Sequence, residues 1–145
     1  MLSAGIYLAF VLFIIAGLFR HNERSIISTD QPPVVSVVIA ARNEEKNLPD
    51  LIQDLVHQEY PLDQLEIIIV DDRSIDSTAK IIKEAAENYA VVNYIRVETL
   101  STEMTPKKHA LTLGIDMAKG DVILTTDADC RVGKLWVSSM AYSVV

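Results

Sequence analysis

The sequence predicts an α/β fold, in which a mostly parallel sheet has helices on both faces and is preceded by one transmembrane helix. Three observations lead to this prediction. Short runs rich in Val and Ile alternate with amphipathic segments, as they do when helices connect parallel strands. Acidic residues follow two of these runs directly, at the edge where a parallel sheet binds its ligands. The first nineteen residues contain no charged side chain.

Residues 1–19 are long enough to cross a membrane once. As a helix they would reach about 28 Å, close to the hydrocarbon thickness of a bilayer. A cleaved signal peptide is the alternative, but the segment lacks a basic start and a small-residue cleavage site. We therefore expect an uncleaved anchor. Arg20, His21 and Arg24 follow it, and this positive flank predicts the cell inner membrane with the globular part in the cytoplasm.

The rest of the chain divides into a linker and a globular part. Residues 20–33 are polar and end in two prolines, which is typical of a juxtamembrane linker. Residues 34–145 suit one domain, or an incomplete part of a larger enzyme. A net charge of −7 without a basic stripe argues against nucleic acid as a partner. The single cysteine, Cys130, supports no disulfide framework and agrees with a reducing compartment.

The first two strands and helices follow in order. Residues 34–41 are nearly all apolar, as in a strand that is buried on both faces. A helix is expected over 44–58, because its apolar residues recur on one face. These residues are Leu48, Leu51, Ile52 and Leu55. A strand over 65–70 leads through an acidic turn to a helix over 78–89, with Asp76 or Ser77 as its N-cap.

The second half repeats the alternation. Residues 91–97 predict a third strand, and a loop then leads to a helix over 107–120, with Gly120 as its C-cap. The fourth strand is expected over 121–129. A last helix-like stretch follows. Its large side chains, which we expect in the core, are Trp136, Met140 and Tyr142.

Polar residues follow three of the four strands, so all of them should lie at one edge of the sheet. Asp127 and Asp129 are one residue apart, and in an extended chain their side chains would face one spot. Two readings stay open on these residues alone. The pair could form a polar turn that caps the next helix. It could instead hold a divalent cation through its carboxylate oxygens.

The other polar residues at this edge also allow two interpretations. Asp71 fits turn chemistry, whereas the carboxylate of Asp72 could accept the imide N–H of a uracil ring. Asn43 could cap a helix whose first turn holds Glu44. Alternatively, this loop backs a nucleoside. The residues that would then contribute contacts are Ala40, Ala41 and Glu44.

Two adjacent lysines, Lys107 and Lys108, open the third predicted helix after Pro106. A solvated pair is the default interpretation. Cations at a helix N-terminus oppose its dipole, however, so another anion could be what they serve. A diphosphate would fit this position.

Taken together, these segments resemble the family 2 glycosyltransferases, which have the GT-A fold with a Rossmann-like nucleotide-binding half. The resemblance runs from Val34 to about Trp136. It rests on the order and spacing of "VSVVIAARNEE", "IIIVDDRSIDST", "KKHALTLGIDMAKGDVI" and the "DAD" that corresponds to the family's DxD motif. Two positions depart from the family pattern. Arg73 replaces a small Gly or Asn, and Pro106 replaces a glycine.

The resemblance implies an inverting transferase that moves a sugar from a nucleotide-diphosphate sugar, UDP-linked, to a saccharide or lipid acceptor. It implies that Asp72 binds uracil and that Lys107 approaches the diphosphate. Asp127 and Asp129 would hold ribose and a Mg²⁺ or Mn²⁺ ion, with Asp129 as the direct ligand. The family's catalytic aspartate has no counterpart before Val145. We therefore expect the donor half of an enzyme, inactive by itself.

Two rival functions are compatible with the same residues. A receiver-like phospho-acceptor domain also gathers aspartates at strand ends, but its acidic pair follows the first strand, whereas here it follows the second. A non-catalytic, membrane-tethered nucleotide-binding module would keep the same pocket without turnover.

Overall fold

A computed structural model describes residue 7, residue 11 and residues 31–144 of the chain. The four strands form one parallel sheet in the order β3-β2-β1-β4. Their bounds are β1 Val35–Ala41, β2 Leu65–Asp71, β3 Val92–Arg96 and β4 Val122–Thr125. The register places Val35 beside Leu65 on one side and beside Val122 on the other. The predicted parallel sheet is therefore confirmed in this part of the chain.

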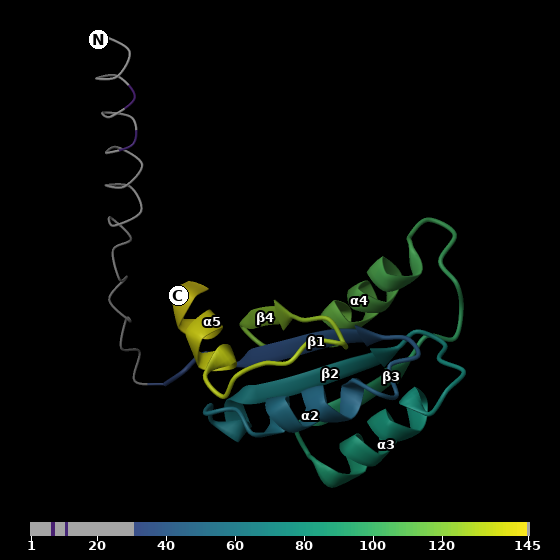
Figure 1. Cartoon of the computed structure of the whole chain (residues 1–145), viewed down its shortest axis with the longest axis horizontal. Coiled ribbons are helices and arrows are strands. Elements are labelled where there is room, and N and C mark those ends of the chain that lie inside the picture. Colours follow the sequence, from purple (N-terminus) through teal and green to yellow (C-terminus); the bar gives the residue numbers. More distant parts are fainter. Residues whose placement is uncertain (1–6, 8–10, 12–30, 145) are drawn as a thin grey trace.

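Helices cover both faces of the sheet, as predicted (Figure 1). Their bounds are α2 Leu48–Val56, α3 Thr78–Asn88, α4 Pro106–Met117 and α5 Trp136–Val144, with a short 3-10 turn at Leu62–Gln64. Figure 1 shows α2 and α3 below the sheet and α4 above it. The side chains of α5 pack into the same cluster as those of α2 and α3.

Alternate residues of β1 enter two different cores, because successive side chains of a strand point to opposite faces. Val37 and Ile39 pack with the predicted apolar stripe of α2, whose four residues are all buried. Val38 packs on the other face with Val70 and with Ala110 of α4. The strand is buried on both faces, which explains why Ser36 is its single polar residue.

The first helix begins later than the pattern predicted. α2 starts at Leu48 rather than at residue 44, and Asn43 is not its N-cap. Asn43 has a left-handed backbone (φ 56°), which cannot belong to a helix, and its Oδ1 accepts a hydrogen bond from the N–H of Ile75. Asn43 is therefore part of a loop that bonds to the loop after β2, instead of capping α2.

The prediction of Gly120 as a C-cap was wrong. α4 ends at Met117, and Ala118 has an extended backbone (φ −65°, ψ 137°). The N–H of Gly120 instead donates to Ser36 Oγ at 2.9 Å, and a Cβ on Gly120 would lie 2.5 Å from the backbone nitrogen of Ser36. The glycine is thus needed for close approach to β1.

Two further expectations differ in detail. The fourth strand ends at Thr125 rather than at residue 129, because its pairing with β1 stops at Val38. In the last helix, Val137 and Ala141 are fully buried, whereas Met140 is exposed. Trp136 is partly buried against the core.

Within residues 7, 11 and 31–144, no helix is long and apolar enough to cross a membrane. The predicted anchor over 1–19, apart from positions 7 and 11, and most of the linker over 20–33 lie outside the described residues.

Candidate functional site

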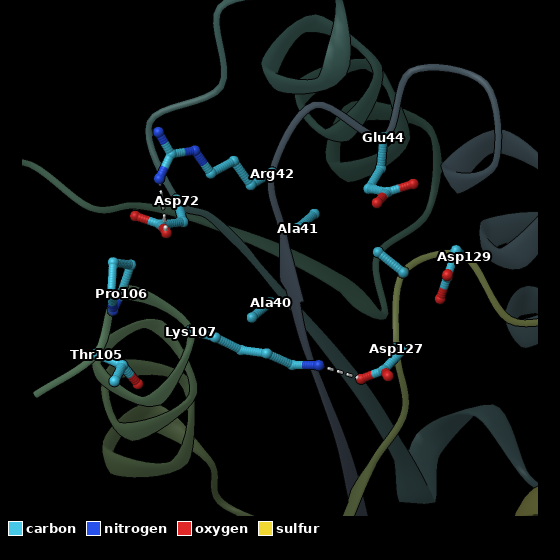
Figure 2. A pocket seen from close by; sticks show the side chains of 11 residues that line it. Ala40, Ala41, Arg42, Glu44, Asp72, Thr105, Pro106, Lys107, Asp127 and Asp129 are labelled. Carbon is cyan, nitrogen blue, oxygen red and sulfur yellow. Dashed lines mark hydrogen bonds and ion pairs between the residues drawn. The ribbon is translucent and has the colours of Figure 1, made fainter.

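A pocket of about 440 Å³ opens at the carboxyl ends of β1, β2 and β4, beside the N-terminus of α4 (Figure 2). It lies where the rule for parallel sheets places a ligand. All seven residues predicted for the nucleotide-sugar and metal site line this pocket. The full lining is Ala40, Ala41, Arg42, Glu44, Asp72, Thr105, Pro106, Lys107, Asp127, Ala128 and Asp129.

The loops after β1 and β2 are locked to each other beside the pocket. Ser74 Oγ accepts a hydrogen bond from the N–H of Asn43 at 3.0 Å, and Asn43 Oδ1 accepts one from the N–H of Ile75 at 2.9 Å. Thr78 Oγ1 accepts a third from the N–H of Glu44 at 2.8 Å. These bonds hold Glu44 at the wall of the pocket and fix the backbone that precedes it.

Asp71 and Asp72 have different environments although they are adjacent. Asp71 is fully buried, and its Oδ1 accepts a hydrogen bond from the N–H of Ser74 at 2.9 Å. Its Oδ2 lies 4.0 Å from Arg96 Nε. Asp71 therefore has the turn role that the sequence favoured, and Asp72 is the one that faces the pocket.

Two arginines flank Asp72. Arg73 donates from Nε to Asp72 Oδ1 at 2.8 Å, and its Nη2 lies 2.6 Å from the same oxygen. Arg42 Nη1 lies 3.9 Å from Oδ2. Figure 2 marks this ion pair with a dashed line. Arg42 is not among the residues predicted for the site, although it lines the pocket. Its position directly after β1, one residue beyond the Ala41–Asp71 pair of the register, is the signal that places it beside Asp72.

At the other end of the pocket, Lys107 Nζ lies 2.7 Å from Asp127 Oδ1 (Figure 2). Both side chains are more than half exposed. The hydrogen bond with Asp127 raises the pKa of Lys107, and the nearby charge of Asp129 adds to this. The lysine at the start of α4 therefore does approach an anion, and in this structure the anion is a carboxylate.

Asp127 and Asp129 both line the pocket, but not as neighbours in a strand. The chain leaves β4 at Thr125 and turns at residues 128–129, where the N–H of Cys130 bonds to the carbonyl of Asp127 at 3.2 Å. Buried Ala128 anchors this turn in the core, so that the two carboxylates stay at the surface.

The donor set fits a hard divalent cation. Carboxylate oxygens are the ligands that Mg²⁺ and Mn²⁺ prefer, and Mg²⁺ sites often use one or two carboxylates together with substrate phosphates and water. In the part of the chain that the structure describes, no three His, Cys, Asp or Glu side chains converge as a metal site.

The chain belongs to glycosyl transferase family 2, whose family model matches residues 36–144. It is 35% identical over 139 residues to the probable glycosyltransferase YdaM of Bacillus subtilis, covering 91% of this chain and 33% of that protein. It is 34% identical over 113 residues to the beta-monoglucosyldiacylglycerol synthase of a Nostoc species, covering 78% of this chain and 23% of that protein. Membership of this family favours a transferase over a receiver-like domain.

Solved structures share the fold. S. aureus TarS 1-349 in complex with UDP-GlcNAc has a TM-score of 0.63 and 27% identity, covering 74% of this chain and 30% of that one. The mannosyltransferase PcManGT from Pyrobaculum calidifontis, in complex with GDP-Man and Mn²⁺, has a TM-score of 0.64 and 23% identity, covering 98% and 42%. The chain thus spans a third or less of the two curated relatives, and less than half of these two structures.

Proposed function

We propose that this chain is the donor-binding part of an inverting glycosyltransferase that moves a sugar from a UDP-linked donor to a saccharide or lipid acceptor. The observation that carries the proposal is one pocket with two distinct ends. The carboxylate of Asp72 lies at one end, and the ammonium group of Lys107 lies at the other, where Asp127 and Asp129 also line the pocket. The named activities of the relatives and the UDP-GlcNAc bound to TarS support it.

The base would lie at the Asp72 end. A carboxylate accepts hydrogen bonds and donates none, so it suits the N–H of uracil. The small side chains of Ala40 and Ala41 leave room for the nucleoside along the end of β1, and Glu44 is close enough to contribute a contact from the loop.

The diphosphate would lie at the α4 end. Lys107 would exchange Asp127 for a phosphate oxygen, and the N-terminus of α4 would add the positive end of its dipole. Asp127 would then be free for the ribose, and Asp129 would contact the metal directly. A bound Mg²⁺ or Mn²⁺ ion supplies electrostatic stabilisation of the diphosphate leaving group.

The reaction also needs a base that deprotonates the acceptor hydroxyl. The resemblance places that aspartate and the acceptor site in a longer enzyme, so this chain would bind donor without transferring sugar. Residues 1–19 would anchor the enzyme in the inner membrane, with the pocket on the cytoplasmic side.

Calorimetric titration of the full chain with UDP, with and without Mn²⁺, tests the proposal. We expect Mn²⁺ to tighten UDP binding, and Asp129→Asn to remove this effect while Asp116→Asn, an exposed carboxylate on α4, preserves it. UDP binding that is absent, or that is indifferent to Mn²⁺ in the wild type, would contradict the assigned site.

A further inference from the structure

We propose that Arg73 makes the pocket select uracil over guanine by occupying one of the two oxygens of Asp72. The inference rests on the proposed function, because it concerns the base end of the same nucleotide pocket. It assigns a role to a residue outside the pocket lining, at a position where the resemblance leads one to expect Gly or Asn.

The two oxygens of Asp72 differ in their partners. Oδ1 is held by Arg73, with Nε at 2.8 Å and Nη2 at 2.6 Å. Oδ2 faces Arg42, whose Nη1 at 3.9 Å is beyond hydrogen-bond length. The lining of the pocket includes Arg42 but not Arg73. Arg73 therefore bonds to the carboxylate without lining the pocket. Among the described residues, none donates a hydrogen bond to Oδ2.

The backbone conformation of Arg73 supports its bond to Asp72 Oδ1. Arg73 has a left-handed conformation, with φ 57°, in the loop that is bonded to the loop after β1. Three quarters of its side chain is buried, and the Asp72 side chain is 6% exposed. A guanidinium that is packed in this way does not leave Oδ1 as easily as one that extends into solvent.

Bases differ in the number of donors that they present to a carboxylate. The Watson–Crick edge of uracil has one ring N–H between two carbonyl oxygens, whereas guanine has a ring N–H beside an exocyclic amine. A carboxylate with two free oxygens can accept both guanine donors. A carboxylate oxygen can accept two hydrogen bonds, but Oδ1 has two guanidinium nitrogens of Arg73 beside it, at 2.8 and 2.6 Å, and a guanine amine would have to displace one of them. Oδ2 is the oxygen that stays open, which matches the single donor of uracil and leaves the guanine amine without a partner.

Arg42 completes the match. Its guanidinium is half exposed and lies beside Oδ2, where it can donate to a carbonyl oxygen next to the ring N–H. Cytosine places an acceptor at the corresponding ring nitrogen, which would face the carboxylate oxygen without a proton between them. Asp72 Oδ2 and Arg42 together thus recognise a ring N–H next to a carbonyl group. Uracil and guanine both have this arrangement, and Arg73 discriminates between them.

The test compares dissociation constants for UDP and GDP, measured with Mn²⁺ on the full chain. Asn tolerates φ near 57°, so Arg73→Asn removes the guanidinium without straining the backbone. Arg73→Lys keeps a positive charge near Oδ1. Lys80→Gln, an exposed lysine on α3, controls for the loss of one charge.

We expect the wild type, Arg73→Lys and Lys80→Gln to prefer UDP, and Arg73→Asn to lower the GDP-to-UDP ratio of dissociation constants by about tenfold, since freeing Oδ1 restores a second acceptor. Arg73→Gly, which accepts the same φ, repeats the test if the Asn variant melts too low. An unchanged ratio in a UDP-preferring protein overturns this inference alone. A wild type that prefers GDP overturns it together with the UDP-linked donor of the proposed function. A wild type that binds neither nucleotide overturns the proposed function as well.

Discussion

Lys107 and Asp127 form an ion pair of 2.7 Å that joins the first turn of α4 to the loop after β4 across the mouth of the pocket. The pair belongs to the surface, because both side chains are more than half exposed. Such a pair contributes little to folding, about 0–1 kcal/mol. Its residues are therefore free to serve a ligand.

Lys107→Gln should separate these two roles. We expect its free energy of unfolding to change by less than about 0.5 kcal/mol, since the pair is solvent-screened. Its affinity for UDP should fall about tenfold, because a charge-assisted bond to phosphate is lost. Lys108→Gln, on the same helix but outside the pocket lining, is the matched control. Equal losses of UDP affinity in both variants would show a general charge effect.

The same pair sets a pH dependence. The hydrogen bond with Asp127 raises the pKa of Lys107 above the ordinary value of 10.5. Its contribution to folding is thus fully present below pH 10.5 and is lost as the pH rises through the higher, folded-state pKa. Unfolding of wild type and Lys107→Gln should differ slightly at neutral pH and converge only above that range.

Asp129→Asn in the complete enzyme tests whether the turn after β4 carries a metal. The change keeps the shape of the side chain and removes a charge that would contact the cation. We expect a loss of about 3 kcal/mol of transition-state stabilisation, or roughly a hundredfold in rate, with the melting temperature preserved. The assay is Mn²⁺-dependent sugar transfer at matched folding. Equal rates and equal metal dependence in the two proteins would leave only the turn interpretation.

Gly114→Ala should destabilise the chain. An added Cβ would overlap Val38 Cγ1 and lie 3.0 Å from Val70 Cγ2, where α4 rests on the sheet. Overpacking costs about 1–3 kcal/mol, which outweighs the gain in helix propensity of about 1 kcal/mol. Gly133→Ala is the control, since nothing lies within 4 Å of its added Cβ. Urea unfolding should distinguish the two, and equal midpoints would mean that α4 shifts freely.

The ion pair between Arg131, in the loop after the pocket, and Asp54 of α2 should stabilise the fold to an extent that depends on pH. It donates from Nε and Nη2 to the two oxygens of Asp54 at 2.6 and 2.9 Å, and this hydrogen bonding holds the pKa of Asp54 below its ordinary value of 3.8. The contribution is present above pH 3.8 and is lost as the pH falls through the lower, folded-state pKa. Arg131→Gln should lower the free energy of unfolding slightly at pH 7 and not at all once Asp54 is protonated. If the loss of unfolding free energy in Arg131→Gln is the same at every pH, the effect comes from packing and not from the ion pair.

The predicted anchor can be tested in cells. We expect the full chain to stay with membranes after carbonate extraction and a variant that lacks residues 2–19 to be released, because the uncharged segment supplies the apolar length that a span requires. Release of the full chain by carbonate would contradict the anchor.

The sheet and the pocket could be predicted from the sequence because both depend on simple periodicity. Strands that are buried on both faces show unbroken apolar runs, and the carboxyl ends of parallel strands converge. Ala40, Asp72 and Asp129 therefore reached one pocket although they are far apart in the sequence.

Long-range loop contacts explain what the sequence did not show. Nothing local to Asn43 reveals that it will bond to the N–H of Ile75 rather than cap a helix. The same holds for Gly120, whose role depends on the nearness of Ser36. The pairing of Arg73 with its neighbour Asp72 depends on a left-handed backbone that composition does not predict.

The early end of β4 has a consequence for how the proposed nucleoside would be recognised. Since β4 pairs with β1 only from Val35 to Val38, the last residues of β1 pair with β2 alone within the described part of the chain. The carbonyl of Ala41 accepts the N–H of Asp72 on the β2 side, so the main-chain groups of Ala40, which point to the opposite side of the strand, are the ones left for a ligand at the pocket wall. Recognition through these groups is invisible to an alanine scan, because the side chain is already alanine. It is a property of the backbone, which only insertion, deletion or proline at this position would remove.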